Sequence, residues 1–178
     1  MIVANTPAPN TPAASVAAPA SFAFRCVPLP SETAARFRAT GVDDGGNRIE
    51  ARVSDGTAPC RHCLRLAAAG ERVLLGSYAL PRPRGIYGAA SPVFVHAEPC
   101  GRFEAQNAVA PTVLANGLVS VRAYDERDFC LYDLGVVAAG PEAEAPLFRA
   151  LADPRTAFVN VHTARPGCWL ARAERLPT

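Results

Sequence analysis

The chain has 178 residues, which is a typical length for one domain and is enough to bury a hydrophobic core. Its formal net charge of +2 is too small to indicate a nucleic-acid partner or an anionic membrane surface. All 18 basic residues are arginine, which excludes mechanisms that need a Schiff-base lysine, a P-loop lysine or a serine–lysine pair. We therefore expect partners of another kind, an unidentified small molecule or protein.

The distribution of apolar residues predicts a cytoplasmic protein. No run of about 18 apolar residues occurs, so we expect no transmembrane helix. The N-terminus has neither the basic region nor the continuous apolar region of a signal peptide. Thiols stay reduced in the cytoplasm, so the six cysteines indicate metal ligands, reactive thiols or core residues before they indicate disulfides.

The first third of the chain contains a tail and the first elements of a single domain. Residues 1–21 are mostly Ala, Pro, Thr and Ser and predict a disordered tail, followed by one globular domain at 22–178. Alternating apolar residues predict the first strand at 22–27. A short helix follows at residues 32–39, for which we expect Ser31 as the N-cap and Gly41 as the C-terminal stop.

The rest of the domain is rich in predicted strands. Residues 60–66 form a short turn, and residues 101–116 have a weak pattern that favours loop. The remaining elements are a helix at 141–152, a hairpin turn at 125–128, and strands at 48–53, 71–80, 92–96, 118–124, 129–137, 157–163 and 168–173. About eight strands and two short helices, without regular strand–helix alternation, predict an α+β fold with a mainly antiparallel sheet.

Cysteine and histidine gather around two short motifs. Cys60 and Cys63 form a Cys-x-x-Cys pair, and His96 and Cys100 follow the strand predicted at 92–96. Two cysteines at this spacing can bind one ion from a single turn. If the sheet brings the two motifs together, three cysteines and one histidine would complete a closed zinc site of the structural kind.

A catalytic version of this site uses Glu98. Zinc-dependent deaminases combine a His-x-Glu motif with Pro-Cys-x-x-Cys, and this chain contains both motifs in reversed order. Cys60, Cys63 and His96 would then bind zinc, and Glu98 would move protons in a metal-assisted hydrolysis. Glu98 shares a face with His96 only if the strand continues through it.

Two further hypotheses need no metal. Cys60 and Cys63 could be the reactive pair of a thiol–disulfide protein, although the expected βαβ context is missing. Alternatively, the thiols only fill core space in a non-enzymatic binding module. Four other residues are candidates for pocket or anion contacts: His62, Tyr78, Arg122 and Tyr124. The ring of His62 is expected to point away from an ion that both neighbouring cysteines bind.

Several segments resemble the DUF1203 family. They are the Cys-x-x-Cys segment at 59–65, Ser77-Tyr78, the block at 91–100, Arg122-Ala123-Tyr124 and Gly167-Cys168. This is a bacterial family of small proteins with no assigned activity. The resemblance would cover residues 22–176. It implies one compact domain, and it brings no catalytic residues with it.

Overall fold

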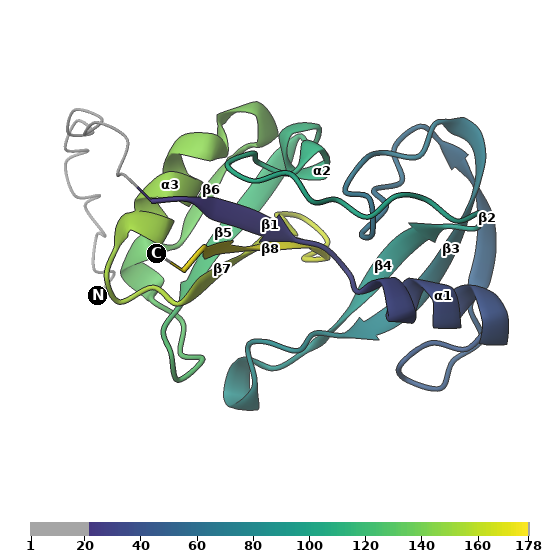
Figure 1. The fold of residues 1–178 in the computed structure, drawn as a ribbon, viewed down its shortest axis with the longest axis horizontal. Coiled ribbons are helices and arrows are strands. Elements are labelled where there is room, and N and C mark those ends of the chain that lie inside the picture. Colours follow the sequence, from purple (N-terminus) through teal and green to yellow (C-terminus); the bar gives the residue numbers. More distant parts are fainter. Residues whose placement is uncertain (1–21, 178) are drawn as a thin grey trace, which may run out of the picture.

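The computed structural model describes residues 22–177, so the tail expected at 1–21 lies outside the described residues. Eight strands in this range form two antiparallel sheets, one toward each end of the molecule (Figure 1). The five-stranded sheet has the order β1-β8-β7-β5-β6, and the three-stranded sheet has the order β2-β3-β4. The strands are β1 (Phe24–Val27), β2 (Glu50–Asp55), β3 (Ala69–Ala79), β4 (Ala90–His96), β5 (Leu118–Tyr124), β6 (Val136–Ala139), β7 (Phe158–Thr163) and β8 (Trp169–Arg175).

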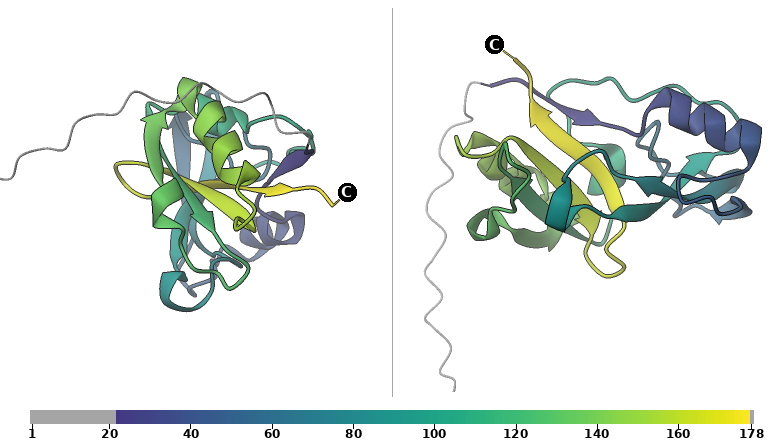
Figure 2. Two further views of the ribbon diagram at one scale, coloured as in Figure 1. Left: turned by 90° about the vertical axis from the view of Figure 1, so that its left-hand side faces the viewer. Right: turned by 90° about the horizontal axis from the view of Figure 1, so that it is seen from below.

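The helices cover the two sheets separately. The α-helices are α1 (Ser31–Thr40), α2 (Pro111–Leu114) and α3 (Glu144–Ala152), and the 3₁₀ turns are η1 (Gly85–Tyr87), η2 (Tyr132–Leu134) and η3 (Gly140–Glu142). Helix α3 packs on the five-stranded sheet and α1 on the three-stranded sheet (Figure 2). The buried side chains are Leu147 and Leu151 of α3 and Phe37 of α1. The predicted α+β fold with antiparallel pairing is confirmed, but two sheets take the place of one. No helix in residues 22–177 is long and apolar enough to cross a membrane.

For helix α1, the C-terminal stop at Gly41 was predicted correctly, but the prediction of Ser31 as the N-cap was wrong. Gly41 has a left-handed φ of 63°, and its amide donates to the carbonyl of Phe37. Pro30 occupies the N-cap position, so Ser31 is the first helical residue and makes no capping hydrogen bond. The hydroxyl of Ser31 lies instead 2.9 Å from Nε2 of His62, because the chain before α1 packs against the Cys-x-x-Cys loop.

The strand predicted at 129–137 was wrong in its extent. Strand β6 begins only at Val136, and η2 occupies much of the segment between the turn and the strand. The carboxylate of Asp128 binds Arg82 at 2.6 Å and Arg84 at 3.1 Å, so contacts with a distant loop fix this segment. Helix α2 was missed within the segment expected to be loop, since only four residues carry its pattern.

The hydrophobic core is divided in the same way as the sheets. The larger cluster lies between α3 and the five-stranded sheet. A smaller cluster lies between α1 and the three-stranded sheet, and it contains Phe37, Val93, Val95, Cys60 and Cys63. The Cys-x-x-Cys pair is therefore part of the smaller core.

Candidate metal centre

The segment around Cys60 and Cys63 folds back on itself. Pro59 and Leu66 form an antiparallel bridge, and the amide of Cys60 donates to the carbonyl of Arg65 at 2.9 Å. Leu64 closes the loop with a left-handed φ of 52°, a conformation that costs a non-glycine residue about 1 kcal/mol or more. Its side chain is fully buried in the larger core, and burial of that side chain offsets the cost.

Backbone hydrogen bonds hold this loop to four other parts of the chain. The partners are the link before α1, strand β4, the segment after β4 and helix α2. The pairs are Leu29 with Arg61 (2.8 Å), Arg61 with Phe94 (2.8 Å), Phe103 with His62 (3.1 Å) and Thr112 with Leu64 (2.9 Å). Such a fully bonded loop can hold two thiols in fixed positions.

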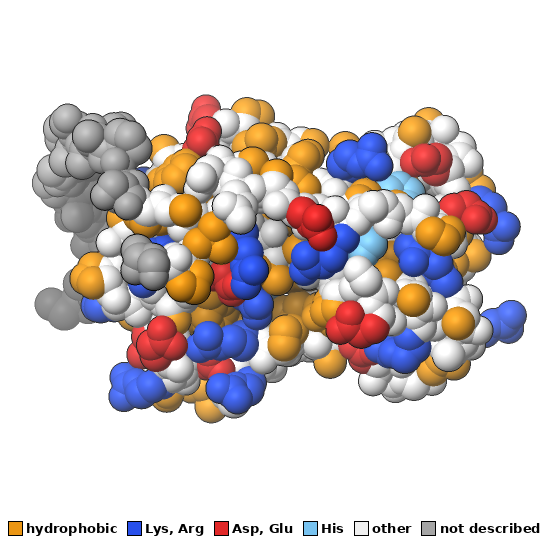
Figure 3. Space-filling model, in the orientation of Figure 1, with side chains coloured by type: hydrophobic (Ala, Val, Ile, Leu, Met, Phe, Trp, Pro, Cys, Tyr) orange, Lys and Arg blue, Asp and Glu red, His pale blue; other side chains and the backbone are white. Residues whose placement is uncertain are grey.

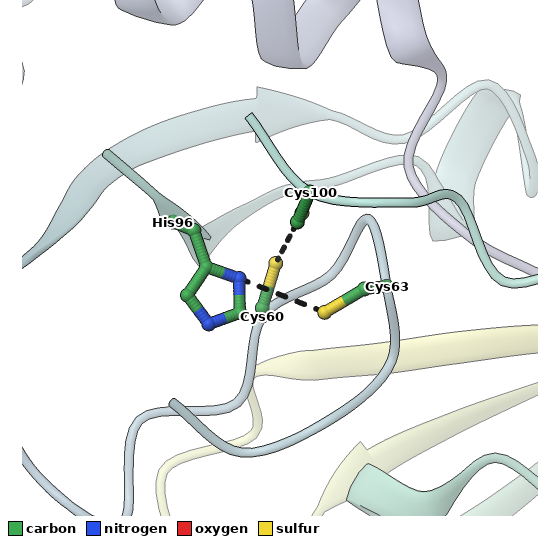
Figure 4. Close-up of side chains that lie close together, drawn as sticks. All are labelled: Cys60, Cys63, His96 and Cys100. Atoms are coloured by element: carbon green, nitrogen blue, oxygen red, sulfur yellow. Dashed lines mark hydrogen bonds between the residues drawn. The ribbon is translucent and has the colours of Figure 1, made fainter. Parts of the chain in front are cut away.

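The structure brings the two cysteine and histidine motifs face to face (Figure 4). One ligand atom from each of Cys60, Cys63, His96 and Cys100 lies within 4.8 Å of the other three. The Sγ atoms of Cys60 and Cys100 are 3.9 Å apart, and Sγ of Cys63 is 3.6 Å from Nδ1 of His96. A tetrahedral ion with bonds of about 2.3 Å separates its ligand sulfurs by about 3.8 Å. The cluster therefore needs only small side-chain shifts to hold such an ion.

The loop stabilises a thiolate at Cys60. The neighbouring Cys63 thiol and the backbone amides of Cys63, His62 and His96 favour the charged form of this sulfur. Together they lower the pKa of Cys60 to about 4, even though burial acts in the opposite direction. The hydrogen bond to Cys60, together with burial, raises the pKa of Cys63. The two sulfurs share one proton, and a cation would take its place.

A carboxylate orients the ring of His96. Nε2 of His96 is 3.4 Å from Oε2 of Glu71, and Nδ1 faces the sulfur of Cys63. When Nε2 carries the proton toward Glu71, the lone pair of Nδ1 is free to bind an ion. Carboxylates commonly hold metal-binding histidines in this way.

His62 and Arg38 surround the sulfur of Cys100. Nδ1 of His62 is 3.3 Å from that sulfur, and a guanidinium nitrogen of Arg38 is 4.0 Å from it. Burial lowers the pKa of His62, which favours a neutral ring that donates from Nδ1 to Cys100 and accepts from Ser31 at Nε2. The ring of His62 therefore faces the cluster, contrary to the prediction that it points away.

The other predicted site residues lie elsewhere. Glu98 is exposed and follows the end of β4 at His96, so the strand does not continue through it. Tyr78 packs in the smaller core that holds the cysteines. Arg122 and Tyr124 are on β5 of the other sheet, and no hydrogen bond or ion pair within residues 22–177 links either of them to the cluster.

Sequence reasoning missed three residues around the cluster: Arg38 contacts Cys100, Glu71 contacts His96, and Ser31 contacts His62, which in turn contacts Cys100. Two of them come from α1 and one from β3, so no spacing relates them to the motifs. Only the packing of α1 and the pairing of β3 with β4 bring them there.

Fold and site define a small α+β protein of two antiparallel sheets, with a buried cluster of three cysteines and one histidine that could hold a metal ion. A family described as "Protein of unknown function (DUF1203)" matches residues 57–175, and the chain belongs to this family. The match includes all four cluster residues, but it begins later than residue 22, where the resemblance was expected to start. No curated protein and no solved structure matches the chain.

Proposed function

We propose that the protein binds one zinc ion through Cys60, Cys63, His96 and Cys100. The observation that carries the proposal is the convergence of three sulfurs and one imidazole nitrogen within 4.8 Å. Thiolate and imidazole are ligands that zinc prefers, and four of them complete its tetrahedral coordination. The site requires reduced cysteines, which is consistent with a cytoplasmic location.

We propose a structural role for this ion. Cys100 approaches Cys60 and would fill the fourth position, which a catalytic site keeps for water. The exposed position of Glu98 gives no support to a role in hydrolysis. The ion would join the Cys-x-x-Cys loop to the end of β4 and to the segment after it, and so strengthen a core that is small on its own.

The thiol–disulfide alternative receives less support from the geometry. A redox-active dithiol needs one sulfur that an incoming disulfide can reach. Cys60 is 0% exposed and Cys63 is 4% exposed, so neither sulfur is open to such a partner.

Elemental analysis of protein purified without a metal-binding tag tests the proposal. We expect about one zinc per chain in the wild type and a loss of most of it in Cys60→Ser and His96→Asn. Cys130→Ser is the matched control, because this cysteine lies outside the cluster, and it should keep the ion. Wild-type protein without metal, or zinc content unchanged in Cys60→Ser, would overturn the proposal.

A further inference from the structure

A second candidate site lies where the two sheets meet. A pocket of about 60 Å³ opens between the end of β3, the segment after β1, and strands β7 and β8. In the space-filling view the surface is hollowed between the two sheets, with arginines close to the hollow (Figure 3). Val27, Leu80 and Trp169 give the pocket apolar walls, and Tyr78 and Arg172 give it polar groups.

Arg172 reaches this pocket without a full set of acceptors. Its Nε is buried and has no hydrogen-bond partner among residues 22–177. The carboxylate of Glu174 lies 3.3 Å from this Nε, and it also pairs with Arg25 at 2.6 Å. Two guanidinium groups thus share one carboxylate, which leaves excess positive charge beside the pocket.

A second pair of arginines near the pocket also shares one carboxylate. Arg82 lines the pocket and shares the carboxylate of Asp128 with Arg84. Two hydrogen bonds fix the side-chain amide of Asn160, which accepts from Trp169 at 3.3 Å and donates to the carbonyl of Arg82 at 3.2 Å. The pocket therefore presents hydrogen-bond donors and positive charge, and a ligand that accepts hydrogen bonds would complement it.

The hydroxyl of Tyr78 is the second free donor. Tyr78 is 5% exposed, and its hydroxyl makes no hydrogen bond within the described part of the chain. Burial raises its pKa, the carboxylates of Asp44 and Glu32 act in the same direction, and the nearby charge of Arg172 acts against them. Asp44 is itself paired with Arg36. The hydroxyl stays protonated near neutral pH and can donate to an anion.

We propose that this pocket binds a small carboxylate with a short apolar chain. The carboxylate oxygens would accept hydrogen bonds from Arg172 and Tyr78, because a planar guanidinium matches a carboxylate in two parallel bonds. The apolar chain would lie against Trp169 and Leu80. A volume of about 60 Å³ limits the ligand to a few carbon atoms, and the apolar walls favour a carboxylate over inorganic phosphate.

The single tryptophan of the chain lines the pocket, so its fluorescence reports directly on binding. We expect propionate to change the emission of Trp169 in the full-length protein along a saturable curve. Arg172→Gln should weaken binding about tenfold or more, and Tyr78→Phe about two- to tenfold. The control is Arg149→Gln on α3, which removes an exposed arginine outside the pocket and should bind propionate like the wild type.

Three further ligands define the chemistry. Propionamide has the same size without the charge and should leave the emission unchanged, as should chloride at equal ionic strength. Inorganic phosphate that binds as tightly as propionate would overturn the carboxylate assignment. A flat propionate titration, or equal binding by the wild type and Tyr78→Phe, would overturn the site as a whole. Tyr78→Phe keeps the aromatic ring and removes only the hydroxyl, so it tests the site even if Arg172→Gln fails to fold.

Discussion

His62 is the residue that most directly tunes the candidate metal centre without belonging to it. Its ring connects the Ser31 hydroxyl, at 2.9 Å, to the sulfur of Cys100, at 3.3 Å. A hydrogen bond to a ligand sulfur fixes the orientation of that ligand and stabilises its charged form. His62 would therefore act on a bound ion through Cys100.

This geometry predicts the effect of His62→Ala on zinc affinity. The variant should retain about one zinc per chain but bind it about tenfold more weakly, within the range usual for outer-shell partners of a metal site. Competition with a chromophoric chelator measures the affinity. Ser31→Ala removes only the outer hydrogen bond of His62 and should have a smaller effect. Unchanged zinc affinity in His62→Ala would show that the contact with Cys100 has no energetic role.

His162 is a buried histidine that makes the stability of the protein depend on pH. It is 7% exposed, its Nδ1 is 3.0 Å from the carbonyl of Gly167, and burial lowers its pKa to about 4. The unfolded chain, with a histidine pKa of 6.5, therefore takes up this proton before the folded chain does. The contribution of neutral His162 is complete above pH 6.5 and decreases as the pH falls toward 4.

We expect urea unfolding at pH 7 and pH 5 to detect this linkage. Lowering the pH across this interval should reduce the free energy of unfolding by about 2 kcal/mol through His162. In His162→Asn, whose amide nitrogen takes the place of Nδ1 toward Gly167, the decrease should be smaller by that amount. This comparison separates His162 from other titrating groups. Equal pH dependence in both proteins would contradict the expected role of burial.

At the scale of elements, the loop that carries Cys60 and Cys63 is held by contacts with several distant segments. Four backbone hydrogen bonds to other segments hold it, and Leu64 closes it in a left-handed conformation. A glycine would be expected at such a position, yet leucine occupies it because its side chain fills the larger core. A turn was expected at residues 60–66, but no local pattern indicated the left-handed conformation of Leu64.

At Leu64 the strained backbone destabilises the fold and the buried side chain stabilises it. Two variants separate these effects. Leu64→Ala loses the buried side chain and keeps the strained backbone, so the free energy of unfolding should fall by about 2–5 kcal/mol. Leu64→Gly loses the same contacts but removes the strain, and should be more stable than Leu64→Ala by about 1 kcal/mol. Chemical denaturation measures both. The opposite order, which is normal for glycine and alanine elsewhere, would argue against a left-handed residue here.

At the scale of the whole molecule, the two sheets have separate cores joined at a few points. Strand β8 belongs to the five-stranded sheet, while its Trp169 packs against Tyr78 of the smaller core with ring centroids 5.7 Å apart. The buried Arg61 donates to the carbonyl of Trp169 at 2.8 Å and thereby ties the Cys-x-x-Cys loop to the same strand. Three of the four candidate ligands, Cys60, Cys63 and Cys100, lie in or against the smaller core.

Removal of the ion should consequently affect the two sheets unequally. In hydrogen exchange on chelator-treated protein, we expect amides of β3 and β4 to exchange about tenfold or more faster than in the metal-bound protein, because the smaller core loses its cross-link. Amides of β7, which lie over the larger core, should change much less. A uniform increase in both sheets, or none in either, would contradict a role confined to the three-stranded sheet.

The sequence by itself determined the class of fold, the family and the four residues of the candidate centre. Alternating apolar residues predict strands, and Gly41 ends a helix, because both signals act between neighbouring residues. The Cys-x-x-Cys spacing is likewise local, and the histidine and cysteine after β4 are recognisable as ligand types.

Only the tertiary structure decided how these parts meet. It separates the strands into two sheets, places Glu98 on the surface, brings Glu71 and Arg38 to the cluster, and brings Ser31 to His62. It also forms the pocket between the sheets. These features depend on contacts between segments far apart along the chain, and such contacts are set by packing and strand pairing, for which short sequence patterns carry no signal.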